Sequence, residues 1–224
     1  MVHQIATSRF RVFIEAFLAV CVVFLIGFSL GYFIESGRAD ALMRYSQGYE
    51  IEALDLRLQN YYYQLMGEDT CTLAIEQNFL FADQLYEKGL QLERYEESNQ
   101  ITAQMVNEKK LYVLLKTELW MNSILFKEKC KVGFDTIVYL YVNEPENSAK
   151  VAEQKIISNV LKSVKESRGN DVILLPIAGD IGLQSVELQK RIYNITSLPA
   201  IIINEKEVLY GFQREEDILK RLSE

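Results

Sequence analysis

Cysteine is the residue type in this sequence with the most obvious chemistry, and the chain has three cysteines: Cys21, Cys71 and Cys130. Their spacing matches neither a Cys-x-x-Cys redox motif nor a set of metal ligands. The single histidine, His3, lies ahead of every segment that could fold. A histidine-containing zinc site, a Ser-His-Asp triad and a Cys-His dyad are therefore excluded from the body of the protein. We predict no catalytic residue, no metal site and no cofactor.

The elements that must position Cys71 and Cys130 are helices. Apolar residues recur at three-to-four spacing over about 38–66, 71–95 and 100–127. Short connections make neighbouring long helices antiparallel, so the start of the second helix lies beside the end of the third. We therefore predict a Cys71–Cys130 disulfide at the end of the bundle away from the membrane. The alternatives are two free cysteines and a pair that exchanges disulfides with a client.

An apolar run from Ala16 to Ile34 contains no charged residue. Its length is close to the ~20 residues with which a helix crosses a bilayer. The alternative is a cleaved signal peptide, favoured by the small-residue pattern Ala39-Asp40-Ala41. The run is longer than a usual signal core, so we predict a permanent single-pass anchor. Cys21 lies inside it and is expected to be an inert membrane residue.

The orientation of this anchor is only weakly marked by charge. Arg9 and Arg11 precede the run and Arg38 and Arg44 follow it, so the positive-inside rule is nearly balanced. We predict a cytoplasmic N-terminus in the cell membrane and an extracytoplasmic body. A disulfide agrees with this placement, because disulfides persist in oxidising compartments.

Composition limits the partners of the body and suggests its division. The 224 residues are 49% hydrophobic and 25% charged, with a net charge of −7 and no basic cluster. Nucleic acid is therefore a poor candidate partner. We predict a short tail over 1–11, an anchor over 12–35, a helical bundle or stalk over 36–130 and a separate domain over 131–224.

The last ninety or so residues show a different periodicity, beginning with the β-branched and aromatic run Phe134–Val142. The expected order is β-α-β-α-β-β-α. Its elements are a strand over 134–142, a helix capped by Asn147 or Ser148 and ended by Gly169, a strand over 171–177, a helix over 185–193, strands over 200–204 and 208–212, and a helix over 215–222.

Three segments of this region resemble the thioredoxin-like family: IVYLYVNEPENSAK (137–150), Ile195–Asn204, and Gly211-Phe212 before the last helix. The resemblance covers about 134–224 and implies an α/β fold with a cis-proline just before the third strand, at Pro199. Active members carry Cys-x-x-Cys after the first strand, where this chain has Pro145-Glu146-Asn147-Ser148. Dithiol exchange needs two sulfur atoms, so the domain is expected to be inactive in that reaction.

From the resemblance we expect a membrane-anchored, redox-inactive, thioredoxin-like protein that acts as a protein-binding or chaperone-like module. The family exposes backbone beside the cis-proline that can pair with an extended peptide. The candidate face comprises Leu198, Pro199, Glu144, Pro145, Glu146 and Asn147. Two alternatives stay open: a thiol–disulfide oxidoreductase that uses Cys71 and Cys130, and a purely structural spacer anchored in the membrane.

Overall fold

The structure is a computed structural model that describes residues 9–66, 70–97, 103–131 and 133–222. It divides into two units, residues 1–54 and 55–224. The boundary falls inside the first helix, α1 (Arg9–Met66). The predicted division at 130/131 falls within the second unit.

The N-terminal unit holds the predicted anchor. Within the described residues, one helical segment is long and apolar enough to cross a membrane, Val12–Tyr32, with 21 residues. The side chains of this segment are exposed except that of Cys21, which is half-buried. The predicted apolar helix is therefore confirmed.

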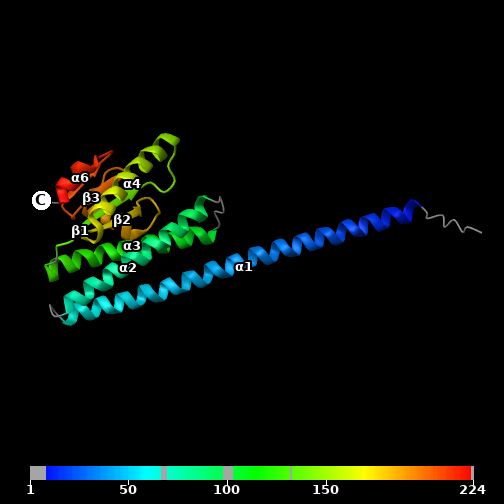
Figure 1. Ribbon diagram of the computed structural model, residues 1–224, viewed down its shortest axis with the longest axis horizontal. Coiled ribbons are helices and arrows are strands. Elements are labelled where there is room, and N and C mark those ends of the chain that lie inside the picture. Colours follow the sequence, from blue (N-terminus) through cyan, green and yellow to red (C-terminus); the bar gives the residue numbers. More distant parts are fainter. Residues whose placement is uncertain (1–8, 67–69, 98–102, 132, 223–224) are drawn as a thin grey trace, which may run out of the picture. The chain divides into compact units, whose positions relative to one another are not determined.

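The second unit begins with the end of α1, followed by α2 (Cys71–Glu97) and α3 (Ala103–Cys130), labelled in Figure 1. Cys71 and Cys130 form a disulfide with a Cα–Cα distance of 5.6 Å, as predicted. It ties the first residue of α2 to the last residue of α3. The last turns of α1 contact α3 through the Arg57–Glu118 ion pair and the Tyr63–Phe126 ring contact.

The expected element order is found after α3, and β1 begins at Asp135 because a β-branched and aromatic run starts there. The elements are β1 (Asp135–Tyr141), α4 (Ser148–Arg168), a 3₁₀ turn η2 (Gly169–Asp171), β2 (Val172–Ala178), α5 (Gln184–Ile192), β3 (Ala200–Ile203), β4 (Glu207–Tyr210) and α6 (Glu215–Leu222). Asn147 caps α4 by accepting a hydrogen bond from the Lys150 N–H, and Gly169 ends the helix with a φ of +56°.

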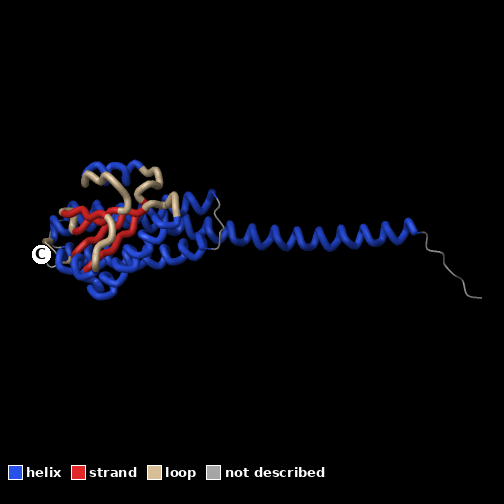
Figure 2. The backbone as a smooth tube through the Cα atoms, turned by 90° about the horizontal axis from the view of Figure 1, so that it is seen from above, coloured by secondary structure: helices blue, strands red, loops and turns tan. Residues whose placement is uncertain are grey.

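The four strands form one mixed sheet in the order β2-β1-β3-β4. Strand β1 pairs parallel with β2 and antiparallel with β3, and β3 pairs antiparallel with β4. Strand β2 is therefore an edge strand, which explains how it accommodates Pro176, a residue with no N–H to donate to a ladder. The protein is thus mostly helical, with one mixed four-stranded sheet and one N-terminal apolar helix (Figure 2).

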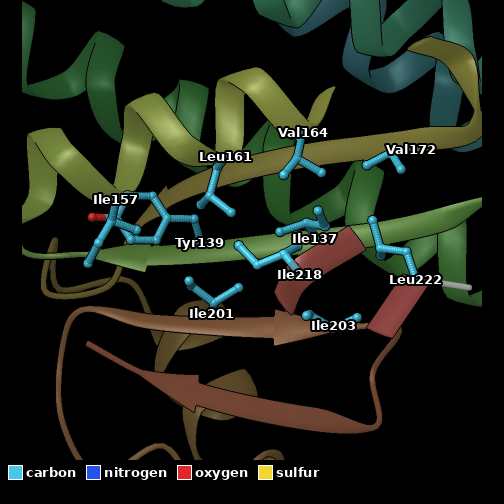
Figure 3. Packing of buried hydrophobic residues seen from close by; sticks show 10 residues of the cluster. All are labelled: Ile137, Tyr139, Ile157, Leu161, Val164, Val172, Ile201, Ile203, Ile218 and Leu222. Atoms are coloured by element: carbon cyan, nitrogen blue, oxygen red, sulfur yellow. The ribbon is translucent and has the colours of Figure 1, made fainter. Parts of the chain in front are cut away.

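Helices cover both faces of this sheet. Helices α4 and α6 cover the face that carries Ile137 and Tyr139, and Figure 3 shows the core they share with β1 and β3. The other face, with Val138 and Leu140, receives α3, and α5 packs against α3. Helix α3 thus belongs to the helical hairpin with α2 and also to the core of the sheet. Trp120 of α3 shows this double role, since it is fully buried and stacks on Tyr193 at the end of α5.

Candidate functional site

The strand directions gather four loops at one end of the sheet. The carboxyl ends of β1, β2 and β4 lie there, together with the amino end of β3. We call this the cis-proline end, formed by residues 142–147, 179–183, 195–199 and 211–214. All six candidate face residues lie there, in two of these loops. The structure therefore places the six predicted residues at the same end of the sheet.

Pro199 is buried, and the Leu198–Pro199 peptide bond is cis, as the resemblance implied. Leu198 packs over Gly179, the residue after β2. A Cβ atom added at Gly179 would lie 2.8 Å from Leu198 Cδ1. The missing side chain of glycine leaves the space that Leu198 occupies, so a larger residue there would displace the Leu198 side chain.

The loop after β1 is held by side chains from neighbouring elements. Gln154 of α4 accepts from Val142 N–H at 2.7 Å and donates to Val142 O at 3.0 Å. Asp180 Oδ1 accepts from Asn143 N–H at 2.7 Å. Asn147 is occupied in capping α4, whereas Glu144 and Glu146 are exposed to solvent. The two carboxylates thus belong to a solvated loop.

The backbone just before Pro199 also contains groups without a hydrogen-bond partner among the described residues, as do Glu144 and Glu146 in the loop after β1. The N–H of Ile195 bonds to Lys190 O, and the N–H of Thr196 bonds to the Tyr210 hydroxyl at 3.2 Å. Within the described residues, the N–H and C=O groups of Ser197 and Leu198 bond to nothing. Ser197 is exposed and Leu198 is half-buried, so these backbone groups are accessible to water or to the main chain of another protein.

The disulfide lies at the opposite end of the sheet. Cys130 precedes the first residue of β1 by five positions, and the candidate loop follows the last residue of that strand. Strand β1 spans seven residues, or about 20 Å at ~3.3 Å per residue. The Cys71–Cys130 pair therefore does not replace the thiols missing from 145–148.

The sheet end beside the disulfide, here the disulfide end, carries a polar network that sequence reasoning missed. Lys127 Nζ donates to Thr136 Oγ1 at 2.7 Å, to Asn204 Oδ1 at 2.9 Å and to Glu205 Oε2 at 3.1 Å. Thr136 Oγ1 in turn donates to Glu205 Oε1 at 2.6 Å, which also accepts from Trp120 Nε1 at 2.9 Å. The network joins α3, β1 and the β3–β4 turn.

Electrostatics and backbone geometry both indicate that this network is structural. Burial lowers the pKa of Lys127, and the neighbouring Glu205 carboxylate opposes part of that shift. Asn204 and Glu205 have φ values of +50° and +58°, a region that non-glycine residues seldom occupy. Because the hydrogen bonds hold both residues in that turn, the network fixes the hairpin against α3. No sequence signal marks it, since Lys127 and Glu205 are 78 positions apart.

A comparison of the chain with protein-family models and with curated proteins finds no match.

Proposed function

We propose that this chain is a membrane-anchored, thioredoxin-like protein without a thiol active site, which binds an extended segment of another protein. Support for the fold assignment comes from the β-α-β-α-β-β-α order and from a sheet in which the last two strands form an antiparallel hairpin at one edge. The segments 137–150 and 195–204 add the sequence resemblance. Fold alone does not define function, so the binding proposal depends on the site.

The observation that carries the binding proposal is the unpaired backbone of Ser197 and Leu198. An extended peptide can satisfy such groups by adding its own main chain beside them, a mode of recognition that needs no cysteine. Main-chain pairing of this kind supplies affinity, and side chains around it supply specificity.

Apolar surface lies next to this backbone. Ala200 pairs with Tyr210 at the end of the β3–β4 ladder, and Leu198 and Phe212 each lie two residues beyond that pair. Phe212 is 56% exposed, so its ring is accessible to a partner. Aromatic side chains frequently anchor protein–protein contacts, and an extended segment beside Leu198 would cover this ring. Glu144 and Glu146 form a solvated rim on the neighbouring loop.

The anchor and the disulfide support the proposed location. The apolar segment Val12–Tyr32 would tether the body to the cell membrane as a single-pass protein. The Cys71–Cys130 disulfide favours an oxidising compartment, and therefore a body outside the cytoplasm. A chaperone-like module or a component of an envelope assembly fits this arrangement.

The experiment is cross-linking in native membranes with the full-length protein, followed by identification of the chains attached to residues 131–224. Phe212→Ser and Leu198→Asp are compared with wild type, and Ile156→Ser is the matched control. The exposed fraction of Ile156, 53%, is similar to that of Phe212, but Ile156 lies on α4 and outside the cis-proline end. We expect at least a tenfold loss of the partner adduct in the two site variants and no change in the control. Partner adducts at wild-type yield in both site variants would refute the proposed binding face.

A further inference from the structure

Lys116 of α3 is a buried lysine that joins the helix to the edge of the sheet. Lys116 is only 6% exposed. Its Nζ donates to the carbonyl oxygen of Pro176 in β2 at 2.7 Å, and it lies 4.1 Å from the centre of the Tyr112 ring. In a strand, the N and C=O of one residue point the same way, so Pro176 turns its donor-free side outward. Lys116 therefore covers the outer edge of β2.

This contact lacks the usual compensation for a buried charge. Within the part of the chain that the structure describes, no carboxylate pairs with Lys116. A carbonyl dipole and a ring face stabilise an ammonium less than a carboxylate does, and taking an ammonium out of water is costly. Burial accordingly lowers the pKa of Lys116 from 10.5 to about 7.

The other titratable groups on the elements around Lys116 make contacts of their own. On the α2–α3 face, Lys88 and Glu108 form a buried ion pair at 3.5 Å. Burial raises the pKa of Tyr112, on which Tyr141, Glu93 and Tyr86 also act. Strand β2 contributes no titratable side chain. On α5, Glu187 pairs with Lys190, and on α4, Lys165 donates to the Gly169 and Val172 carbonyls.

We propose that Lys116 is a proton-operated latch between α3 and the edge strand β2. With a neutral amine the contact is closed, and the amine donates to Pro176 O without a buried charge. When the amine is protonated, water competes for the ammonium and the contact opens. Opening uncovers the outer edge of β2, whose backbone groups can then pair with another strand. This inference is independent of the proposed peptide site.

The direction of the pH dependence follows from proton binding. An exposed lysine holds its proton up to its ordinary pKa of 10.5, whereas the closed state loses it above about 7. Between these two values the open state binds more protons, so raising the pH favours closure. One proton corresponds to about a tenfold fall in the opening equilibrium constant per pH unit. Below about pH 7 both states are charged, and the constant levels off.

The test is native-state hydrogen exchange of the full-length protein in detergent between pH 6 and pH 9, corrected for the intrinsic exchange rate. We expect protection of β2 and of the middle of α3 to rise about tenfold per pH unit above pH 7.5 in wild type. Lys116→Met should abolish this slope. The matched control is Lys162→Met, because Lys162 lies on α4 in an exposed ion pair. A slope that persists in Lys116→Met, or is absent in wild type, would overturn the latch.

A second measurement covers the case in which Lys116→Met fails to fold. Wild-type protein labelled at lysine Cε is titrated by NMR, and the Lys116 signal is identified by its contacts with the Tyr112 ring. A midpoint between pH 6 and pH 8 supports the latch. A Lys116 signal that titrates above pH 9.5 contradicts it.

Discussion

The two ends of the sheet are built from the same strands but treat their polar groups in opposite ways. At the disulfide end, Lys127, Thr136, Asn204 and Glu205 satisfy one another through a closed set of hydrogen bonds. At the cis-proline end, the backbone of Ser197 and Leu198 has no described partner. The polar groups of the disulfide end are paired within the chain, whereas the backbone groups of Ser197 and Leu198 are left for water or a partner to bind.

This difference indicates that the disulfide end can hold the strands in place while the cis-proline end stays open to solvent. Strands β1 and β3 run through both ends, so fixing them at one end limits their movement at the other. The disulfide and the Lys127 network immobilise α3, β1 and the β3–β4 turn. A rigid support reduces the ordering entropy that a binding partner must overcome. We infer that the disulfide end serves as the support for binding at the cis-proline end.

The largest expected effect comes from opening the disulfide. It closes a loop with a sequence separation of 59 residues, for which chain entropy gives about 4 kcal/mol of stabilisation. Cys71→Ser should therefore lower the free energy of unfolding by about that amount, measured by denaturant titration of the full-length protein in detergent. Cys21→Ser is the control and should leave it unchanged. Equal stability of Cys71→Ser and wild type would show that the disulfide end is not a support.

The next effect concerns the buried network. Thr136→Val removes the hydroxyl that bonds both Lys127 and Glu205, and should cost about 2 kcal/mol because two charged partners lose a hydrogen bond. Thr117→Val is the matched control. Thr117 is also buried, but its hydroxyl bonds only to a carbonyl of its own helix, so its loss should cost under about 1 kcal/mol. Fluorescence of Trp120, the single tryptophan, reports the same network. Similar costs for the two variants would contradict this account of the network.

A smaller effect on stability is expected at the cis-proline end. Gly179→Ala places a Cβ atom 2.8 Å from Leu198 Cδ1, so Leu198 must move. The stability cost should be about 1 kcal/mol, as for other overpacking substitutions, while partner cross-linking should fall at least tenfold. Gly133→Ala serves as the control, since no atom lies within 4 Å of the added Cβ. If Gly179→Ala cross-links to the partner at the wild-type yield, the position of Leu198 does not matter for binding.

The smallest effect is expected for the rim carboxylates. Glu144 and Glu146 are exposed and form no ion pair within the described residues. Replacing both with glutamine should change the free energy of unfolding by less than about 0.5 kcal/mol. A loss above 2 kcal/mol in a denaturant titration would show that the cis-proline end also carries structural contacts that hold the fold.

Much of the architecture could be predicted because it depends on local patterns. The apolar run gave the N-terminal helix, the helix ends gave the Cys71–Cys130 pair, and the change of periodicity gave the strand and helix order. Each of these follows from spacing along the chain.

The contacts between distant segments could not be predicted in the same way. Periodicity shows that α3 buries a face but not that the face packs on a sheet. Lys116 has the sequence appearance of an ordinary helix residue, and Lys127 has no signal linking it to Glu205. Whether the backbone groups of Ser197 and Leu198 find partners depends on where β4 and the loop after β1 end in space. The sequence pattern does not predict those positions.

The central claim is that partners bind at the cis-proline end and not at the disulfide end. A photo-reactive amino acid placed at Ser197, and separately at the exposed Lys206 of the β3–β4 turn, tests it in native membranes. We predict a discrete protein adduct from position 197 that is absent from position 206. Adducts of equal yield from both positions, or an adduct from position 206 alone, would contradict it.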